Sequence, residues 1–501
     1  MHVISLNPGV LRPPRSALLT ASILASVLGA AGCVVGPSYR PSPMNAPAAW
    51  SLPVADGLTD KASPPATWWA SFNDAELDSL IERAIKSNLD LLVAEARVRQ
   101  ARAVRGGSAA DLMPAVNGSA SADRAKQSKN QPFFGALALP PNFPFEYSVY
   151  QLGFDASWEL DLFGGKRRAL EAATADWQGA IEARNDTLVS FLAETGRNYM
   201  ELRGAQQRLQ IAERDVMLQQ EALELTRLRL QEGVATDLDV TRAAALLASL
   251  QAATPPLDTS VRTAMYGLAV LLGQPPGELV GELSQPGALP PLPREVPVGL
   301  PAELLRRRPD VRRAERQLGA ETARIGVAKA EWYPKISLTG DAGAESVSVN
   351  NLFAPSSRFW SLGPNLQWQA LDFGRVRAEV KAQTAAQEAA RATYQKTVLV
   401  ALQETETAIL TFAQEQERRR ALAEAVLQNR RAVELAQALY SNGRVSFLDV
   451  LEARRSLYAS DDQLALSDQT VSLDLIALYK ALGGGWETLP LTPTSAARTS
   501  P

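Results

Sequence analysis

The sequence predicts a mainly α-helical fold with transmembrane β-strands, built from a duplicated unit. Residues 224–250 reappear in related form at residues 434–460, at an offset of 210 positions. Two proline-free stretches, residues 164–231 and 374–441, predict helices about 100 Å long at 1.5 Å per residue. A repeat of this length joined to such helices is typical of a repeated architecture and not of an ordinary globular domain.

The N-terminus predicts export and lipidation. Residues 1–32 read as a signal peptide, because two arginines precede an apolar run that is too short to span a bilayer. The only cysteine, Cys33, follows small residues, as the acylated cysteine of a bacterial lipoprotein does. We therefore expect residues 33–73 to form a lipidated, extended arm; the alternative is that Cys33 is a plain small residue of a cleaved signal.

Composition excludes several classes of function. The only histidine, His2, lies in the signal, so the mature chain has no histidine base, no catalytic triad and no His/Cys metal site. The net charge of −3 gives no basic surface for nucleic acid. We expect no cofactor and no enzymatic activity. After the signal no run of 18 apolar residues remains, so any membrane crossing must use β-strands.

The first repeat is expected at residues 74–273. Ala-, Glu- and Arg-rich segments predict helices at residues 74–88 and 89–113, the second ending before a proline. Residues 115–160 show rough alternation around a Pro/Phe loop and predict a β-hairpin. Residues 164–273 predict a long helical hairpin.

The second repeat is expected at residues 301–484. It carries a matching β-hairpin at residues 335–371 and a long helical hairpin at residues 374–482. A linker rich in proline and glycine, residues 274–300, joins the repeats, and residues 485–501 form a C-terminal tail.

Both long helices end in the same pattern. Each ends at a glycine that suits the left-handed residue of a tight turn, Gly233 or Gly443. A capping box follows, in which a hydroxyl and an acid three residues later satisfy backbone N–H groups: Thr236 with Asp239, and Ser446 with Asp449. The first return helix meets Pro255-Pro256, which we expect to break or kink it.

Two apolar stripes run along the first long helix. One recurs every seven residues and the other lies about 200° round the helix; they comprise Leu202, Leu209, Val216, Leu223 and Leu230, and Ile211, Leu218 and Leu225. A helix with two seams fits a ring in which it touches a neighbour on each side. Likewise, four strands leave two open edges, so the sheet must close with other copies. Three copies predict a barrel of twelve strands continued by a tube of helices.

The residues resemble a known family, the TolC-like outer-membrane efflux proteins, and in particular the lipoprotein branch that serves resistance-nodulation-division (RND) pumps. The matching motifs are Gly32-Cys33 with Val35-Gly36-Pro37-Ser38-Tyr39, Trp68-Trp69 with Phe72 and Leu77, Asn88-Leu89-Asp90, Trp158 with Asp161-Leu162-Phe163-Gly164, Arg307-Arg308-Pro309-Asp310-Val311, and Leu371-Asp372-Phe373-Gly374. They span nearly the whole mature chain.

The resemblance implies a homotrimer with a 12-stranded β-barrel in the outer membrane, continued by a long periplasmic α-helical barrel. It implies a channel that conducts substrates across the outer membrane, with a periplasmic adaptor (membrane fusion) protein and an inner-membrane RND pump as partners and outer-membrane lipid around it. The sequence does not indicate the substrate. The alternative is a secreted or surface coiled-coil structural protein or adhesin without transport activity, which would leave the two hairpins unexplained.

The resemblance also implies a periplasmic gate at the helix turns. Asp449 and Glu452 correspond to acidic positions at the family's constriction, and Tyr440 and Asp239 to positions whose bonds between helices hold the gate closed. Arg444 stands one position before the arginine of some relatives, so its part in the gate stays open. Each of these residues has an alternative interpretation. Asp239 and Asp449 are also capping acids, Tyr440 can be a packed heptad residue, and Glu452 can be a solvated acid.

Overall fold

The computed structural model describes residues 34–40, 46–51, 57–59, 65–128 and 145–488. The predicted signal peptide with Cys33, the tip of the first β-hairpin loop and the end of the C-terminal tail lie outside the described residues. The chain divides into two compact units: Met1–Pro41 with Gln100–Trp177 and Arg316–Arg391, and Ser42–Arg99 with Gln178–Glu315 and Ala392–Pro501. Each repeat contributes to both units, so the units do not follow the duplication.

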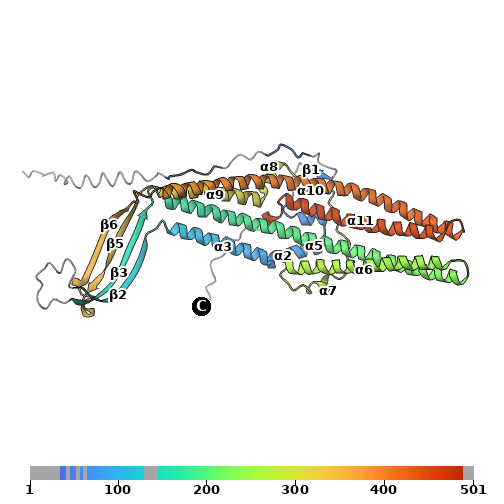
Figure 1. The fold of residues 1–501 in the computed structure, drawn as a ribbon, viewed down its shortest axis with the longest axis horizontal. Helices are drawn as coiled ribbons and strands as arrows, with labels where there is room; N and C mark the ends of the chain where they lie inside the picture. Colours follow the sequence, from blue (N-terminus) through green and yellow to red (C-terminus); the bar gives the residue numbers. More distant parts are fainter. Residues whose placement is uncertain (1–33, 41–45, 52–56, 60–64, 129–144, 489–501) are drawn as a thin grey trace, which may run out of the picture. The chain divides into compact units, whose positions relative to one another are not determined.

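The first unit holds a four-stranded antiparallel sheet (Figure 1). Its strands are β2 (Ala115–Lys126), β3 (Glu146–Leu160), β5 (Lys335–Ser346) and β6 (Arg358–Gln367), in the order β2-β3-β5-β6. Both predicted hairpins are confirmed, and they pair with each other through β3 and β5. Strand β6 ends before the predicted boundary at residue 371, because Trp368 leaves the ladder and its indole nitrogen donates to the carbonyl oxygen of Trp332 at 3.2 Å.

The two faces of this sheet differ in polarity. Directly opposed residues of antiparallel strands point to the same face. One row reads Phe154, Ala342 and Trp360, and the next row reads Asn117, Asp155, Asp341 and Ser361. The large side chains of the first row are exposed, Phe154 to 68% and Trp360 to 79%. Polar side chains of the second row bond to one another, as Asn117 does to Asp155 at 2.9 Å.

Four long helices carry the second half of each repeat. They are α5 (Gly165–Gln231), α6 (Asp237–Leu271), α10 (Arg375–Ser441) and α11 (Phe447–Ala481). The prediction of two very long helices is confirmed. The predicted break at Pro255-Pro256 is wrong, because α6 runs through both prolines as one helix. Two prolines remove only two N–H donors, and the carbonyls they leave belong to exposed residues that water can reach.

The chain also forms shorter helices. They are α2 (Ala75–Ser87), α3 (Leu89–Ala110), α7 (Val280–Leu283), α8 (Pro301–Arg307) and α9 (Pro309–Ala330), with the 3₁₀ turn η1 (Trp68–Phe72). A small parallel pairing joins β1 (Leu58–Thr59) of the arm to β4 (Val296–Pro297) of the linker. The sequence did not predict this pairing, since two-residue strands carry no periodicity.

The core of the second unit collects aromatic and aliphatic side chains from both repeats. Trp68 is 1% exposed and stacks on Tyr479 with ring centroids 5.3 Å apart, so an aromatic contact anchors the end of the arm. In the first predicted stripe, Leu202 and Leu223 are buried within the protomer. In the second stripe, Leu218 is 40% and Leu225 52% exposed. Among the described residues, no helix combines the length and the apolar character needed to cross a membrane.

Candidate functional site

The helix turns have the predicted geometry. Gly233 and Gly443 have φ of +73° and +70°, in the left-handed region that glycine adopts without a Cβ clash. The N–H of Val234 donates to the carbonyl of Arg229 at 2.8 Å, and the N–H of Arg444 donates to that of Leu439 at 2.9 Å. These bonds close the last helical turn and reverse the chain.

Both capping boxes are present and confirmed. The backbone N–H and the hydroxyl of Ser446 donate to Oδ2 of Asp449 at 2.9 and 2.7 Å. The equivalent bonds from Thr236 to Asp239 measure 3.0 and 2.7 Å. The hydroxyl of Ser446 holds the pKa of the Asp449 carboxyl below its ordinary value, with help from its N–H. Asp449 therefore stays charged while it caps the helix.

Glu452 lies in the second turn of α11 and is exposed. Its carboxylate is 3.5 Å from Arg455, and both side chains are more than half exposed. An exposed pair at this distance contributes little free energy to folding. Asp449 and Glu452 are three residues apart, so both carboxylates project from one side of the helix.

Tyr440 packs where the turns of the two repeats meet. Its ring lies 5.4 Å from the ring of Phe447, and Cζ of Arg229 lies 5.0 Å from its centroid. Arg229 belongs to the last turn of α5 and Tyr440 to the last turn of α10, so a cation–π contact joins the two helical hairpins. Within the described part of one protomer, no hydrogen bond joins Tyr440 to Asp239.

Sequence reasoning missed Arg229 and Phe447. Arg229 and Tyr440 are far apart in the chain, and they correspond to different positions of the repeat. The only local signal was a cation in the last turn of α5, where the helix dipole favours positive charge.

A ladder of charged groups continues along the same helices. Arg208 of α5 donates to Asp462 of α11 at 2.7 Å, and Arg214 reaches Asp461 at 3.5 Å. Arg430 of α10 pairs with the same Asp461 at 3.1 Å. Burial raises the pKa of Asp215, which Arg214 opposes at 3.2 Å. These contacts tie the first hairpin to the second at several levels.

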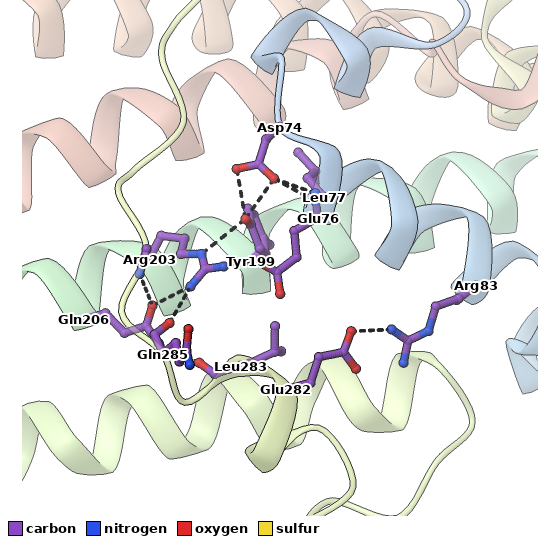
Figure 2. Close-up of polar contacts among 11 residues, drawn as sticks. Asp74, Glu76, Leu77, Arg83, Tyr199, Arg203, Gln206, Glu282, Leu283 and Gln285 are labelled. Atoms are coloured by element: carbon purple, nitrogen blue, oxygen red, sulfur yellow. Dashed lines mark hydrogen bonds and ion pairs between the residues drawn. The ribbon is translucent and has the colours of Figure 1, made fainter.

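A polar cluster fixes the short elements to α5 (Figure 2). The hydroxyl of Tyr199 donates to Asp74, the N-cap of α2, at 2.9 Å, and burial raises the pKa of this hydroxyl. Arg203 donates to the Tyr199 hydroxyl at 3.2 Å and pairs with Glu76. Arg203 also donates to the carbonyl of Gln285 at 3.2 Å, so one buried guanidinium holds both α2 and the linker.

Comparison with known proteins matches this arrangement of hairpins and sheet. The family model described as outer membrane efflux protein matches residues 80–274 and residues 300–484. The pyoverdine export outer membrane protein OpmQ of Pseudomonas aeruginosa is 32% identical over 471 residues, which cover 93% of this chain and 97% of that protein. The toluene efflux pump outer membrane protein TtgC of Pseudomonas putida is 30% identical over 94% of this chain and 96% of that protein.

A solved structure agrees with the sequence comparisons. That of the outer-membrane channel OprN matches with a TM-score of 0.83 at 37% identity, covering 91% of this chain and 100% of that one. Fold, helix turns and relatives together define an outer-membrane efflux channel, which is a transport protein and not an enzyme. The chain belongs to the outer membrane efflux protein family. Membership contradicts the alternative of a coiled-coil protein without transport activity.

Proposed function

We propose that three copies of the chain assemble so that their four-stranded sheets join into one closed sheet in the outer membrane. The observation that carries this proposal is the sheet itself, with β2 and β6 as its edges and with one apolar and one polar face. Edge strands need partners in a bilayer, where water cannot satisfy their N–H and C=O groups. The apolar row with Phe154 and Trp360 faces lipid, and the polar row with Asp155 and Asp341 faces the lumen.

The long helices continue this channel into the periplasm as a helical tube. The exposed second stripe of α5, with Leu218 and Leu225, supports packing against a helix of another copy. The first stripe is used within the protomer, which matches the ring geometry that two seams require. In this division residues 1–32 are removed, and residues 74–273 and 301–484 supply equivalent hairpins on either side of the linker 274–300.

The mature N-terminus is lipid-anchored at Cys33, and the channel works with a periplasmic adaptor and an inner-membrane RND pump. Support for the partners comes from relatives such as TtgC, which is named as the outer membrane protein of an efflux pump. Support for the anchor comes from the signal sequence that precedes Cys33. The channel takes no cofactor and no nucleic acid. Its substrate class stays open.

The turns with Gly233 and Gly443 form the gate at the periplasmic end. Asp449 and Glu452 gather negative charge in a narrow lumen, which attracts cations and repels anions. Tyr440 and Asp239 hold the closed state through contacts between helices, and the contact of Tyr440 with Arg229 adds a link within each protomer.

Planar-bilayer recording tests this function. The purified protein is expected to conduct ions, with lower cation selectivity in the variant Asp449→Ala/Glu452→Ala. The variant Tyr440→Phe/Asp239→Ala is expected to conduct more, because it loosens the closed state. Unchanged selectivity and conductance in both variants would mean that all four residues serve only in helix capping and packing.

A further inference from the structure

The residues that directly follow Cys33 are docked on the protein. The N–H of Val35 donates to the carbonyl of Phe163 at 3.1 Å, between the end of β3 and the start of α5. Arg168, which is 4% exposed, donates to the carbonyls of Val35 and Gly36, both at 3.2 Å, and to the hydroxyl of Ser38 at 3.3 Å. One buried guanidinium thus satisfies three oxygens of the arm.

Glycines shape the slot that receives the arm. Gly36 has φ of +93°, and a Cβ on it would lie 2.5 Å from the Cα of Gly326. A Cβ on Gly326 would lie 2.8 Å from Cγ of Arg168, and one on Gly164 would lie 2.9 Å from the Cα of Val34. Real Cβ atoms do not approach other atoms this closely, so the arm fits only because these residues lack one.

The other repeat supplies an internal comparison. Gly374 corresponds to Gly164 and has a similar φ of +92°, yet no atom lies within 4 Å of the place its Cβ would take. Gly106 corresponds to Gly326 and also has open space around it. Where the first repeat has Arg168, the second has Ala378. The slot is therefore specific to the place where the arm lies, and is not a general requirement of the helix start.

We propose that Arg168, with Gly36, Gly164 and Gly326, forms a clamp that fixes the mature N-terminus beside the end of strand β3. Val34, which directly follows Cys33 in the sequence, is the first described residue within this clamp. A lipid attached to Cys33 would be one peptide bond away from the docked residue Val34. This last consequence rests on the lipidation of Cys33 proposed above, whereas the clamp itself uses protein contacts alone.

Disulfide trapping tests the clamp. Cγ of Tyr39 lies 3.7 Å from the place a Cβ at position 319 would take, which is within reach of a disulfide between Tyr39→Cys and Gly319→Cys. The pair is introduced into the full chain and into a Cys33→Ser chain exported with a cleavable non-lipoprotein signal, which leaves no other thiol. Oxidation is followed by the shift of a protease-generated fragment, and labelling with radioactive palmitate is measured in parallel.

We expect rapid trapping in both chains and at least a tenfold slower rate with Arg168→Ala. Gly36→Ala alters only the arm and must slow trapping likewise, even where Arg168→Ala impairs folding. Gly106→Ala, at the corresponding glycine of the first repeat, must leave the rate unchanged. Trapping that persists with Arg168→Ala and Gly36→Ala, or that requires Cys33, overturns the clamp. Trapping in the Tyr39→Cys/Gly319→Cys chain that keeps Cys33, without uptake of palmitate, keeps the clamp and refutes the lipid anchor instead.

Discussion

Arg308 donates through Nη1 to the carbonyl oxygen of Ala481 at 2.9 Å, in the place where the first repeat uses Asn88 and the carbonyl of Leu271, 3.0 Å apart. Both bonds dock the start of a short helix on the end of a return helix. The duplication therefore preserves a contact while changing its chemistry. Arg308 also pairs with Asp310 at 2.7 Å and with Glu404 at 2.6 Å, so the second repeat gains ion pairs that the first lacks.

Replacing Arg308 with Ala is therefore expected to destabilise the protein more than replacing Asn88 with Ala. Arg308 loses charge-assisted bonds to Asp310 and Glu404 of about 1.5 to 3 kcal/mol each, whereas Asn88 loses neutral bonds to the carbonyl of Leu271 and the N–H of Leu91 of about 1 kcal/mol each. Thermal denaturation of the purified protein in detergent measures both effects. Equal midpoints for the two variants would show that the ion pairs of Arg308 contribute nothing.

The contact between Arg229 and Tyr440 predicts an effect on gating. Arg229→Ala removes a cation–π contact of about 0.5 to 2 kcal/mol, which holds the two hairpin turns together. Because 1.4 kcal/mol is a factor of ten, we expect the open fraction in planar bilayers to rise between about twofold and about thirtyfold. Arg227→Ala is the control, since Arg227 is on the same helix but pairs only with Glu224 of its own turn at 2.6 Å. Equal open fractions in both variants would contradict the link.

The capping box of α11 predicts how selectivity depends on pH. The hydroxyl of Ser446 keeps the pKa of Asp449 below its ordinary value, so the acidic charge survives to lower pH than for a free aspartate. In a Glu452→Ala background, Ser446→Ala is expected to raise the pH at which cation selectivity is lost. Thr236→Ala, at the equivalent cap of α6, should leave that pH unchanged. A shift in the opposite direction would refute the coupling.

Local sequence patterns predict most of the fold. The proline-free stretches, the turn glycines and the hydroxyl-acid spacing at Thr236 and Ser446 depend on neighbouring residues alone, and the structure has each of them. The duplication strengthened weak strand signals, because two segments at matching places are better founded than one. The local rule for proline is wrong in predicting a break at Pro255-Pro256, where the helix continues and Leu257 and Val261 beyond the prolines are buried.

Contacts between segments that are far apart in the chain could not be predicted from the sequence. The contacts of Arg229 with Tyr440 and of Arg168 with Gly36 depend on how the fold brings distant segments together. Neither contact has an equivalent at the corresponding positions of the other repeat. In the sequence, the motif Val35-Gly36-Pro37-Ser38-Tyr39 indicates only a resemblance to a family and gives no physical role for its residues. The structure gives the physical reason for Gly36 in this motif, because a Cβ at this position would collide with Gly326.

The half-buried acid Asp474 on α11 predicts the pH dependence of stability. Burial, reinforced by the nearby Glu415, raises the pKa of Asp474 to about 6. The Glu415 carboxylate accepts a hydrogen bond from Ser467 at 2.6 Å and lies 3.1 Å from Arg418, and it disfavours a second negative charge on Asp474. The folded protein therefore holds the proton of Asp474 more tightly than the unfolded chain does.

The sign follows from proton linkage. An acid whose pKa is raised on folding stabilises the protein while protonated in both states, and this stability is lost as pH rises from about 4 to about 6. Asp474→Asn keeps the shape without the charge, so we expect it to raise the thermal midpoint at pH 7.5 and leave it unchanged at pH 4. Asp468 lies on the same helix as Asp474 and pairs with Arg419 of α10. Asp468→Asn removes the charge of this pair and should lower the thermal midpoint at pH 7.5. A lower midpoint for Asp474→Asn at pH 7.5 would mean that the charged form of Asp474 is favoured in the fold.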